Sequence, residues 1–301
     1  ESVGSVINMQ AGVVNGHFRG GRNTEVTYMI DGVQVDETFG GSSAAVEIQP
    51  EAVQDLEVIT GTFNAEYGRA MSGVVNVVTR DGGPKFEGSA SAGLSFFQTA
   101  NTDIFIGLSP DLNRSQDLKF SLGGPLLGDK ITFFTNVRVQ DNKGHLNGHR
   151  IFTVTDISNF YSDDSLEWTS SKSGDSSYVP MNTGENLSAL LKLSFKLFDG
   201  IRVSLLGSLS DDSWFGYDHG FKYNPDGRAG SYKETGYLSF QLNHMINPKL
   251  FYELKVSYLD NYTGNYLFKD PLDYSLADTA GIYHDGNFHE AKDTVYSYIH
   301  D

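Results

Sequence analysis

The feature that most constrains this chain is a repeated alternation of apolar and polar residues through its last 218 or so positions, roughly two thirds of the sequence. In residues 188–197, apolar side chains occupy every second position, from Ala189 to Leu197. A period of two residues is typical of a β-strand with one apolar face. The pattern predicts seven strands, at residues 86–96, 118–122, 131–140, 188–197, 201–209, 238–242 and 250–258, and an eighth that begins near Asp293.

The connections between these predicted strands alternate in length. Short turns are expected at residues 126–130, 199–200 and 247–248. The other connections are long and rich in Asp, Ser, Asn, Gly and Tyr, at residues 99–116, 143–185, 213–232 and 263–291. Long loops at one end of the strands and short turns at the other are typical of outer-membrane β-barrels. A soluble β-sandwich has no reason to place every long loop at one end.

Composition excludes several other classes of protein. The 301 residues include 20 Phe and 16 Tyr, which is enough apolar surface to argue against disorder. The net charge of −16 argues against nucleic-acid binding, and the absence of cysteine excludes disulfides and thiolate metal sites. No apolar run approaches the roughly 18 to 20 residues of a membrane-spanning helix. The opening ESVGSVINMQ has no signal peptide, so we expect either a cytoplasmic protein or a mature or partial chain.

Residues 1–83 have a different rhythm and predict a small, glycine-rich α+β unit. A short helical spacing occupies residues 2–9, and strands are expected at residues 26–30, 33–35, 56–60 and 74–79. Asp31-Gly32 lies between the first two strands, and this pair predicts a type I′ hairpin turn. Pro50 suits the first turn of a short helix, and residues 63–68 are expected to form a turn or a short helix.

Five motifs in this region occur in a fixed order over about 65 residues. They are Arg19-Gly20, Met29-Ile30-Asp31-Gly32-Val33, Leu56-Glu57-Val58-Ile59-Thr60-Gly61, Glu66-Tyr67-Gly68-Arg69 and the run from Ser72 to Arg80. Together they resemble the plug domain of TonB-dependent outer-membrane receptors. The match is closest to the Oar-like, Bacteroidetes-type receptors. The segment Phe63-Asn64-Ala65-Glu66 departs from the pattern of SusC-like glycan importers, which makes that subgroup and its lipoprotein partner less fitting.

The resemblance implies a mainly β protein in two parts. Residues 1–83 would be the plug domain, without its N-terminal part, and residues 84–301 the first seven to eight antiparallel transmembrane strands of a β-barrel. An eight-stranded barrel is filled by its own side chains and has no room for such a plug. We therefore expect the N-terminal portion of a longer receptor whose barrel has about 22 strands, as plugged outer-membrane transporters do.

The function implied is active uptake, in the bacterial outer membrane, of a ligand too large or too scarce for porins. The partners implied are outer-membrane lipid, an inner-membrane TonB-type energy complex that pulls through a segment outside this chain, accessory outer-membrane proteins, and a ligand that the sequence does not identify. One alternative is a plug-barrel protein with a structural, surface-assembly or secretion-related role and no import. Another is a soluble all-β binding protein.

Two groups of site residues follow from the resemblance. Ligand contacts are expected at outward loop tips, at Asn15, His17, Arg22, Asn23, Asp36, Glu37 and Phe39 of the plug and at Trp214 and Tyr217 of a long loop. The plug motif and its contacts with the barrel comprise Arg19, Gly20, Asp31, Gly32, Glu57, Glu66, Tyr67, Gly68, Arg69, Gly73 and Arg80. For the charges Glu57, Glu66, Arg69 and Arg80, the expected partners inside the barrel are Arg138, Lys192, Lys196 and Glu253. Ordinary surface solubility is the open alternative for these charges.

Catalytic chemistry is not predicted. The sequence has no Gly-Lys-Ser/Thr phosphate loop and no Gly-x-Ser-x-Gly elbow, so we expect no enzyme activity and no cofactor. The pairs His145/His149 and His284/His289 lie in predicted loops, where a surface role is favoured over metal binding. Asp163-Asp164 and Asp211-Asp212 offer carboxylates for Ca²⁺, but solvated acidic loops are the preferred interpretation.

Overall fold

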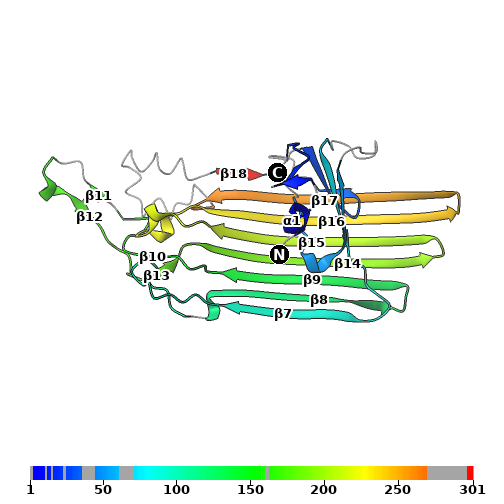
Figure 1. The fold of residues 1–301 in the computed structure, drawn as a ribbon, viewed down its shortest axis with the longest axis horizontal. Helices are drawn as coiled ribbons and strands as arrows, with labels where there is room; N and C mark the ends of the chain where they lie inside the picture. The colour runs from blue at the N-terminus through cyan, green and yellow to red at the C-terminus, as the bar shows by residue number, and fades with distance from the viewer. Residues whose placement is uncertain are drawn as a thin grey trace.

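The structure is a computed structural model in which residues 3–10, 12–14, 16–22, 25–35, 45–60, 71–110, 112–156, 158–159, 163–269 and 297–300 are described. Two β-sheets dominate it, one with four strands and one with eight (Figure 1). The four-stranded sheet and the short elements before it form what we call the small unit. The strands of the eight-stranded sheet run along the long axis of the molecule, and the small unit lies across one face of the sheet (Figure 1).

The small unit contains one α-helix, a 3-10 helix and six strands. They are α1 (Val3–Asn8), β1 (Val13–Val14), β2 (His17–Phe18), β3 (Val26–Ile30), β4 (Val33–Gln34), η2 (Pro50–Ala52), β5 (Val53–Thr60) and β6 (Gly73–Thr79). The sheet order is β4-β3-β6-β5, with β3 and β6 parallel and the other neighbours antiparallel. The predicted helix, strands and Pro50 helix start are confirmed, while residues 63–68 lie outside the described part.

The hairpin between β3 and β4 depends on its two turn residues. Asp31 has φ 49° and Gly32 has φ 75°, which is the left-handed conformation that a type I′ turn requires at both positions. Glycine adopts it without steric cost, whereas Asp31 offsets the cost with hydrogen bonds from Thr79 to its carboxylate. The predicted Asp-Gly hairpin is therefore confirmed, and the same turn points a carboxylate toward the end of β6.

The core of the small unit is closed on both faces of its sheet. Val74 and Val75, which point to opposite faces of β6, are both fully buried. Phe18 is also fully buried, and a Cβ placed on Gly73 would lie 2.6 Å from its ring. Glycine at position 73 therefore allows β2 to pack directly on β6.

The eight-stranded sheet is entirely antiparallel, and strands that follow one another among its long members are neighbours. Its order is β18-β17-β16-β15-β14-β9-β8-β7. Its members are β7 (Glu87–Ser95), β8 (Ser115–Leu127), β9 (Ile131–Asn142), β14 (Thr183–Phe198), β15 (Ile201–Phe215), β16 (Gly230–Asn247), β17 (Leu250–Tyr266) and β18 (Ser297–His300). The seven predicted strands are confirmed. The eighth is present as β18, although residues 293–296 lie outside the described part.

Several strands are longer than the alternation predicted, with polar residues extending them at the long-loop end and further residues at the short-turn end. β16 has 18 residues where only residues 238–242 were predicted. The sequence indicated that the second strand would end at Gly123-Gly124-Pro125, but β8 continues through these residues to Leu127. Pro125 is tolerated there because β7 pairs with β8 only as far as Gly123, so the missing N–H of proline leaves no ladder bond unmade.

Short turns join the strands at one end of the sheet, on the right in Figure 1. Gly128, with φ 56°, lies between β8 and β9, and Gly200, with φ 84°, lies between β14 and β15. At the other end, the long loops contain short elements that the alternation did not predict. They are η3 (Leu112–Arg114), β10 (Asn147–His149), β11 (Ser158–Asn159), η4 (Ser165–Glu167), β12 (Thr169–Ser170), β13 (Tyr178–Pro180), η5 (His219–Phe221) and η6 (Pro225–Gly227).

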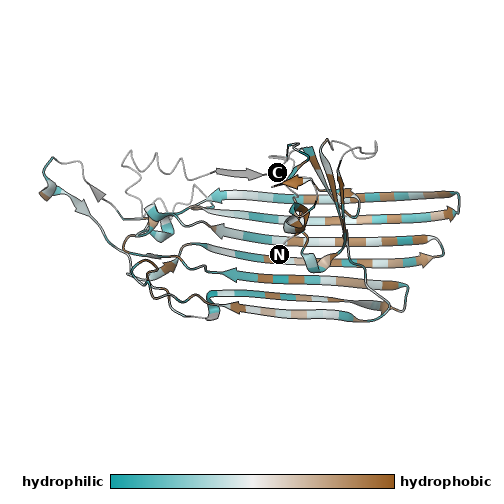
Figure 2. Cartoon of the chain, in the orientation of Figure 1, coloured by the Kyte–Doolittle hydropathy of each residue, from teal (hydrophilic) through white to brown (hydrophobic). Residues whose placement is uncertain are grey.

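The face of the eight-stranded sheet that carries the small unit is here called the inner face, and the opposite face is the outer face. Along β14, Leu190 on the inner face is buried, whereas Leu187, Leu191 and Leu197 on the outer face are about half exposed. Apolar residues recur along the half of the sheet nearer the short turns, and polar residues dominate the long-loop ends (Figure 2). The outer face is thus an apolar surface without a covering layer in the described part.

Helices are short throughout the described residues, with six residues in α1 and three in each 3-10 helix. None of the described helices has the length and apolar character needed to cross a membrane.

Candidate functional site

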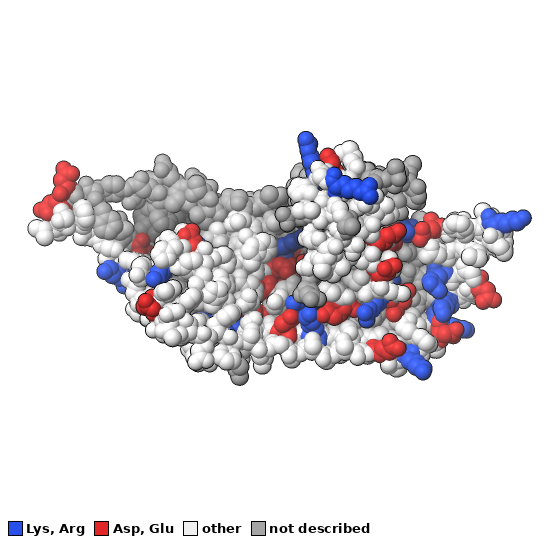
Figure 3. Space-filling model, in the orientation of Figure 1, with Lys and Arg blue, Asp and Glu red and all other residues white. Residues whose placement is uncertain are grey.

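The contact between the small unit and the inner face is the most elaborate polar site in the described structure. Lys and Arg side chains lie beside Asp and Glu around the small unit and toward the short-turn end (Figure 3). Strand alternation decides which side chains reach this contact, because only every second residue of a strand points to the inner face. In β14 these are the even-numbered residues, which include Ser188, Leu190 and Lys192.

Asp31 is the centre of one group of contacts. Its carboxylate accepts hydrogen bonds from the backbone N–H of Thr79 at 2.8 Å and from the Thr79 hydroxyl at 2.6 Å. The same carboxylate forms an ion pair with Lys192 Nζ at 3.1 Å. The side chains of Asp31 and Lys192 are each only 8% exposed, so both charges are removed from water. Gln241 of β16 donates to the backbone carbonyl of Asp31 at 3.0 Å.

Lys192 makes two further contacts with the segment that leaves β6. Its ammonium lies 3.2 Å from the Asp81 carboxylate and donates to the backbone carbonyl of Thr79 at 3.2 Å. Ser194, the next inner-face residue of β14, donates to Asp81 at 2.7 Å. One lysine thus ties the β3–β4 turn and the end of β6 to the sheet. Breaking this contact would leave a buried charge without a partner, which is strongly unfavourable.

A second group of contacts lies at η2, on strands β8 and β9. Lys119 forms an ion pair with Glu51 at 2.8 Å, and Arg138 donates to the side-chain oxygen of Gln49 at 2.9 Å. Arg138 also holds Asp117 with two hydrogen bonds, at 2.8 and 2.9 Å. Burial opposes ionisation of Glu51, but the hydrogen bond and charge of Lys119 outweigh it, so the pKa of Glu51 lies below its ordinary value.

The β3–β4 turn also approaches β17 closely. A Cβ placed on Gly32 would lie 2.6 Å from Nζ of Lys255, and Lys255 in turn pairs with Glu253 at 3.2 Å. The end of this flexible lysine could move aside, but Gly32 also has a positive φ, so a side chain there would be strained. Gly32 is therefore required mainly by the turn.

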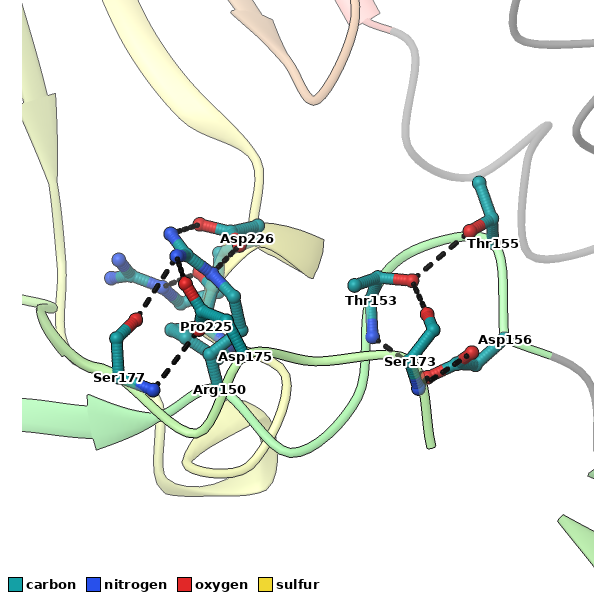
Figure 4. A network of polar contacts seen from close by, with 10 residues as sticks. Arg150, Thr153, Thr155, Asp156, Ser173, Asp175, Ser177, Pro225 and Asp226 are labelled. Carbon is teal, nitrogen blue, oxygen red and sulfur yellow. Dashed lines mark hydrogen bonds and ion pairs between the residues drawn. The ribbon is translucent and has the colours of Figure 1, made fainter. Parts of the chain in front are cut away.

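At the long-loop end, a separate network joins two loops (Figure 4). The guanidinium of Arg150 donates to Asp226 at 2.6 and 3.2 Å, to Asp175 at 3.1 Å and to the Ser177 hydroxyl at 3.0 Å. Asp226 belongs to the loop between β15 and β16, whereas Arg150, Asp175 and Ser177 belong to the loop between β9 and β14. The backbone N–H groups of Ile151 and Phe152 extend the junction by donating to Tyr223 O.

Nearby, Asp156 organises the first of these loops internally. Its carboxylate accepts from the backbone N–H groups of Thr153 and Ser173, at 3.0 and 2.9 Å (Figure 4). Burial alone would raise the pKa of Asp156, but these hydrogen bonds lower it overall.

Arg228 is a buried arginine in the same region. Its guanidinium donates to the backbone carbonyls of Pro225 at 3.0 Å, Gly216 at 2.6 Å and Met181, and it lies 5.7 Å from the centre of the Phe215 ring. Burial lowers the pKa of Arg228 from its usual value. Because its acceptors come from both loops, Arg228 holds the two loops together at a single point.

Four of the nine expected ligand contacts lie in the described residues, His17 and Arg22 in the small unit and Trp214 and Tyr217 at the end of β15 and just after it. His17 is exposed, and its Nδ1 lies 2.9 Å from the backbone carbonyl oxygen of Gly21. The backbone N–H of Arg22 donates to the Glu25 carboxylate at 3.1 Å. Trp214 is 46% exposed at the end of β15, and Tyr217 bonds to His219 at 2.9 Å. The remaining predicted contacts, Asn15, Asn23, Asp36, Glu37 and Phe39, lie outside the described residues.

The plug-motif residues divide into two kinds. Arg19 and Gly20 form an exposed turn with φ 47° and 80°, while Asp31, Gly32 and Gly73 have the roles described above. Glu57 is exposed on the edge strand β5, and Arg80 donates to Val53 O at 3.1 Å. Glu66, Tyr67, Gly68 and Arg69 are outside the described residues.

Of the four expected plug charges, Glu57 and Arg80 are in the described residues, and neither forms an ion pair with the predicted wall residues there. Lys192 contacts Asp31 and Asp81, whereas Glu57 is exposed on the edge strand β5. Arg138 pairs with Asp117 and Glu253 with Lys255, and Lys196 has no ion pair with a described residue. The sequence reasoning missed Gln49, Glu51, Asp81 and Lys119. Their only sequence signal is alternation, which marks Lys119 as an inner-face residue but does not name its partner.

Comparison with known proteins shows which proteins this chain resembles. Residues 4–75 match the family model described as the TonB-dependent receptor plug domain. The TonB-dependent transporter Oar of Myxococcus xanthus is 29% identical over 180 residues, which cover 50% of this chain and 17% of Oar.

Two solved structures share the fold. The outer membrane transporter YddB from Escherichia coli superposes with a TM-score of 0.51 and 12% identity, over 83% of this chain and 33% of YddB. The siderophore receptor PirA from Acinetobacter baumannii gives a TM-score of 0.52 and 15% identity, over 83% of this chain and 34% of PirA. The chain thus spans about a third of these structures and less than a fifth of Oar.

Proposed function

We propose that this chain is part of a TonB-dependent outer-membrane receptor that imports a ligand actively, since its residues 4–75 match the plug-domain family model. The small unit is the plug, and the eight-stranded sheet is part of the barrel wall around it. We place the boundary between plug and barrel in the segment between Thr79 and Glu87, where β6 ends and β7 begins. The protein lies in the bacterial outer membrane, as its relatives do.

The observation that carries the proposal is the buried contact of Lys192 with Asp31 and Asp81. It fastens the plug to the wall by few bonds, all of them polar and directional. Charge pairs and hydrogen bonds can be exchanged for water when the plug is pulled. The apolar part of the contact is small on the side of the wall, where Phe134, Leu190, Leu206 and Tyr237 belong to the same buried cluster as the plug core. A plug held in this way suits a channel that opens under force from an inner-membrane TonB-type complex.

The outer face supports the membrane setting. Half-exposed leucines on β14 and exposed aromatic residues on β17 form an apolar surface that lipid would cover. The partners in this proposal are outer-membrane lipid, the TonB-type complex and a ligand. No catalytic arrangement is found in the described residues of the plug and the loops, and the absence of enzyme activity remains a prediction.

The alternative of a structural or secretion-related protein is less well supported, because Oar is described as a transporter. A soluble all-β protein does not fit a member of an outer-membrane family. The test compares four bacterial strains, with and without the receptor gene and with and without the energy complex. Mass spectrometry of the growth medium then follows every detectable solute. We expect at least one solute to be depleted only when both are present, and depletion that is independent of the energy complex would contradict active import.

A further inference from the structure

The charged residues of the long strands are sorted by sign between the two faces of the sheet. All the lysine and arginine residues of β7, β8, β9 and β14 to β17 lie on the inner face. They are Lys119, Arg138, Lys192, Lys196, Arg202, Lys233 and Lys255. A one-residue register shift would move every side chain to the other face, so this arrangement follows from the register of the sheet.

Contacts with the plug establish the orientation of most of these residues. Lys119, Arg138 and Lys192 bond to plug residues, and Lys255 touches the β3–β4 turn. Lys233 lines a cavity of about 380 Å³ together with plug residues of α1 and β3.

Register places the remaining two on the same face. Lys196 lies four residues beyond Lys192 on β14, an even separation, and Arg202 of β15 is directly opposite Lys196.

The outer face carries the opposite sign. Its charged strand residues are all acidic and lie toward the long-loop end, one on each of five neighbouring strands. They are Asp141, Glu185, Asp211, Glu234 and Asp260. The pairing Glu185 with Asp141 and Asp211 with Glu234 places like charges side by side on this face. The sign of the inner face is therefore not a general property of this acidic chain.

The plug neutralises part of the basic inner face. Asp31 and Asp81 pair with Lys192, and Glu51 pairs with Lys119. The inner face has four carboxylates of its own, on Glu87, Asp117, Asp212 and Glu253, of which Asp117 and Glu253 pair with Arg138 and Lys255. If the plug moves aside, Lys119 and Lys192 lose their carboxylate partners. The exposed wall then has seven cations against four anions in the described strands.

The basic residues continue to the short-turn end, below the plug. A cavity of about 740 Å³ there is lined by Lys130, Lys196, Arg202 and Asn243, with Asp129 and Asp199 at the turns. No ion pair joins Lys196 or Arg202 to a carboxylate in the part of the chain that the structure describes. Along β14, the cations are spaced four residues apart, about 13 Å at the rise of a strand. A negatively charged group can therefore pass from one cation to the next.

We propose that this inner face is an anion-selective path and that the imported ligand carries a net negative charge. The inference rests on the proposed function, since it concerns the ligand of that import. Lys119 and Arg138 lie beside η2. Lys192 lies nearer the short-turn end of the sheet, and Lys196 and Arg202 lie nearest that end, where the ligand would leave the path. A wall of fixed positive charge raises the local concentration of anions and lowers that of cations. The ligand class is an acidic small molecule or an anionic complex.

The first experiment measures the potential at the exit directly. This chain has no cysteine, so a single one can be introduced as a reporter in the full-length receptor, with any cysteine elsewhere replaced by serine. Asn243→Cys places it directly opposite Arg202. Its rate of modification is compared for the anionic sulfonatoethyl and the cationic trimethylammonioethyl methanethiosulfonate reagents. We expect the ratio of anionic to cationic rates, relative to the ratio for a small free thiol, to be at least about threefold. It should fall toward one in the K196Q/R202Q background.

The matched control lies on the outer face of the same sheet. Ser213 is directly opposite Glu185 and shares a surface recess with Asp211. At Ser213→Cys we expect the cationic reagent to react faster, with no change in the K196Q/R202Q background. Equal rates at Asn243→Cys, or a preference that persists without the two cations, would overturn the proposal.

A second experiment examines the whole path in the full-length receptor in planar bilayers, with urea on the plug side to displace the plug. The reversal potential in a tenfold KCl gradient reports the permeability of chloride relative to potassium. We expect chloride to be favoured, and K192Q/K196Q/R202Q to reduce that preference several-fold. Preferential passage of potassium contradicts anion selectivity.

Failure of this inference is distinguishable from failure of import. Anion preference without energy-dependent depletion of any solute would reject the proposed function alone. Energy-dependent uptake with no anion preference would reject only the charge of the ligand.

Discussion

The plug and the barrel wall use the same kinds of residue but bury them differently. In the plug, the neighbouring residues Val74 and Val75 point to opposite faces of β6 and both are fully buried. In the wall, the neighbouring residues Leu190 and Leu191 differ, with Leu190 5% exposed and Leu191 46% exposed. The plug therefore has buried residues on both faces of its sheet, in a core to which wall residues such as Leu190 also contribute, whereas the outer face of the wall requires an apolar environment. The two parts therefore differ in the surroundings that they need, because only the wall has a row of apolar side chains exposed on one face.

The contact between the two parts follows neither pattern. It combines carboxylates on the plug and cations on the wall with an apolar part, in which wall residues such as Phe134 and Leu190 belong to the same buried cluster as the plug core. The central charge pair, Asp31 with Lys192, is as shielded from water as many core residues. Such a contact is specific because each charge needs its partner, but it contributes little net stability compared with an apolar contact. Four changes, ordered by expected size, test this division.

The largest effect is expected at the plug-wall contact. Lys192→Met should destabilise the seated plug by about 3–5 kcal/mol, because Asp31 and Asp81 lose their cation while Asp31 stays buried. The measurement is protease sensitivity of the plug in the full-length receptor as a function of urea concentration. As a control, D31N/K192M removes both charges and should recover about half or more of the loss. A single variant as stable as the parent would show that the pair does not fasten the plug.

The next effect is expected on the outer face. Leu191→Arg should reduce folding into lipid vesicles by about 2–4 kcal/mol if position 191 lies near the middle of the bilayer, and less toward its surface. Folding is followed by the heat-modifiable shift on gels. Ser204→Arg on the inner face of β15 is the matched control and should cost clearly less, since that face is polar. Equal losses at both positions would contradict the assignment of inner and outer faces.

A smaller and local effect is expected in the loops. Arg228→Met removes the donors to the carbonyls of Met181, Gly216 and Pro225 and should lower the local opening free energy of both loops by about 1–3 kcal/mol. Hydrogen exchange of residues 145–152 and 221–228 reports this opening. Arg228→Lys should lie between the parent and the methionine variant. Faster exchange in only one loop would show that Arg228 does not couple the two.

The smallest effect is a dependence on pH at η2. The pKa of Glu51 in the folded protein lies below its ordinary value of 4.5, so its contact with Lys119 contributes fully above pH 4.5. That contribution, about 0.5–1 kcal/mol for a partly exposed pair, is lost as the pH falls through the folded pKa. Plug stability in urea should therefore fall less at acidic pH in Glu51→Gln than in the parent. Glu57→Gln, at an exposed position, should leave the pH profile unchanged.

Much of the fold was predictable because it depends on local patterns. Alternation located the seven long strands, and Asp31-Gly32 predicted its hairpin from the φ angles that the turn requires. The short strands β10 to β13 were missed because two or three residues carry no periodic signal. The polar ends of β16 and β17 were missed because they lack the apolar side chains that the alternation depends on.

The candidate site was less predictable. Asp31 was identified as a turn residue, but its carboxylate also meets Lys192, which is 161 positions later in the chain. Glu57 and Arg80 were expected to contact the wall because they are charged and lie within the motif. One of them projects from an edge strand, and the other bonds within the plug. A charge in a sequence does not reveal which face of a distant strand it will meet.

The sequence by itself predicted the resemblance of residues 1–83 to a plug domain, through five motifs in order. It also determined the strand positions and which residues share a face, because both depend on neighbours one or two positions apart. Only the tertiary structure decided which residues of the plug contact which strands, and that the basic side chains of the wall all lie on the side of the plug. Those choices depend on how eight strands align with one another and on where the plug lies against them. Register propagates from strand to strand through long-range hydrogen bonds, and no local pattern encodes the position of a separate domain against the resulting surface.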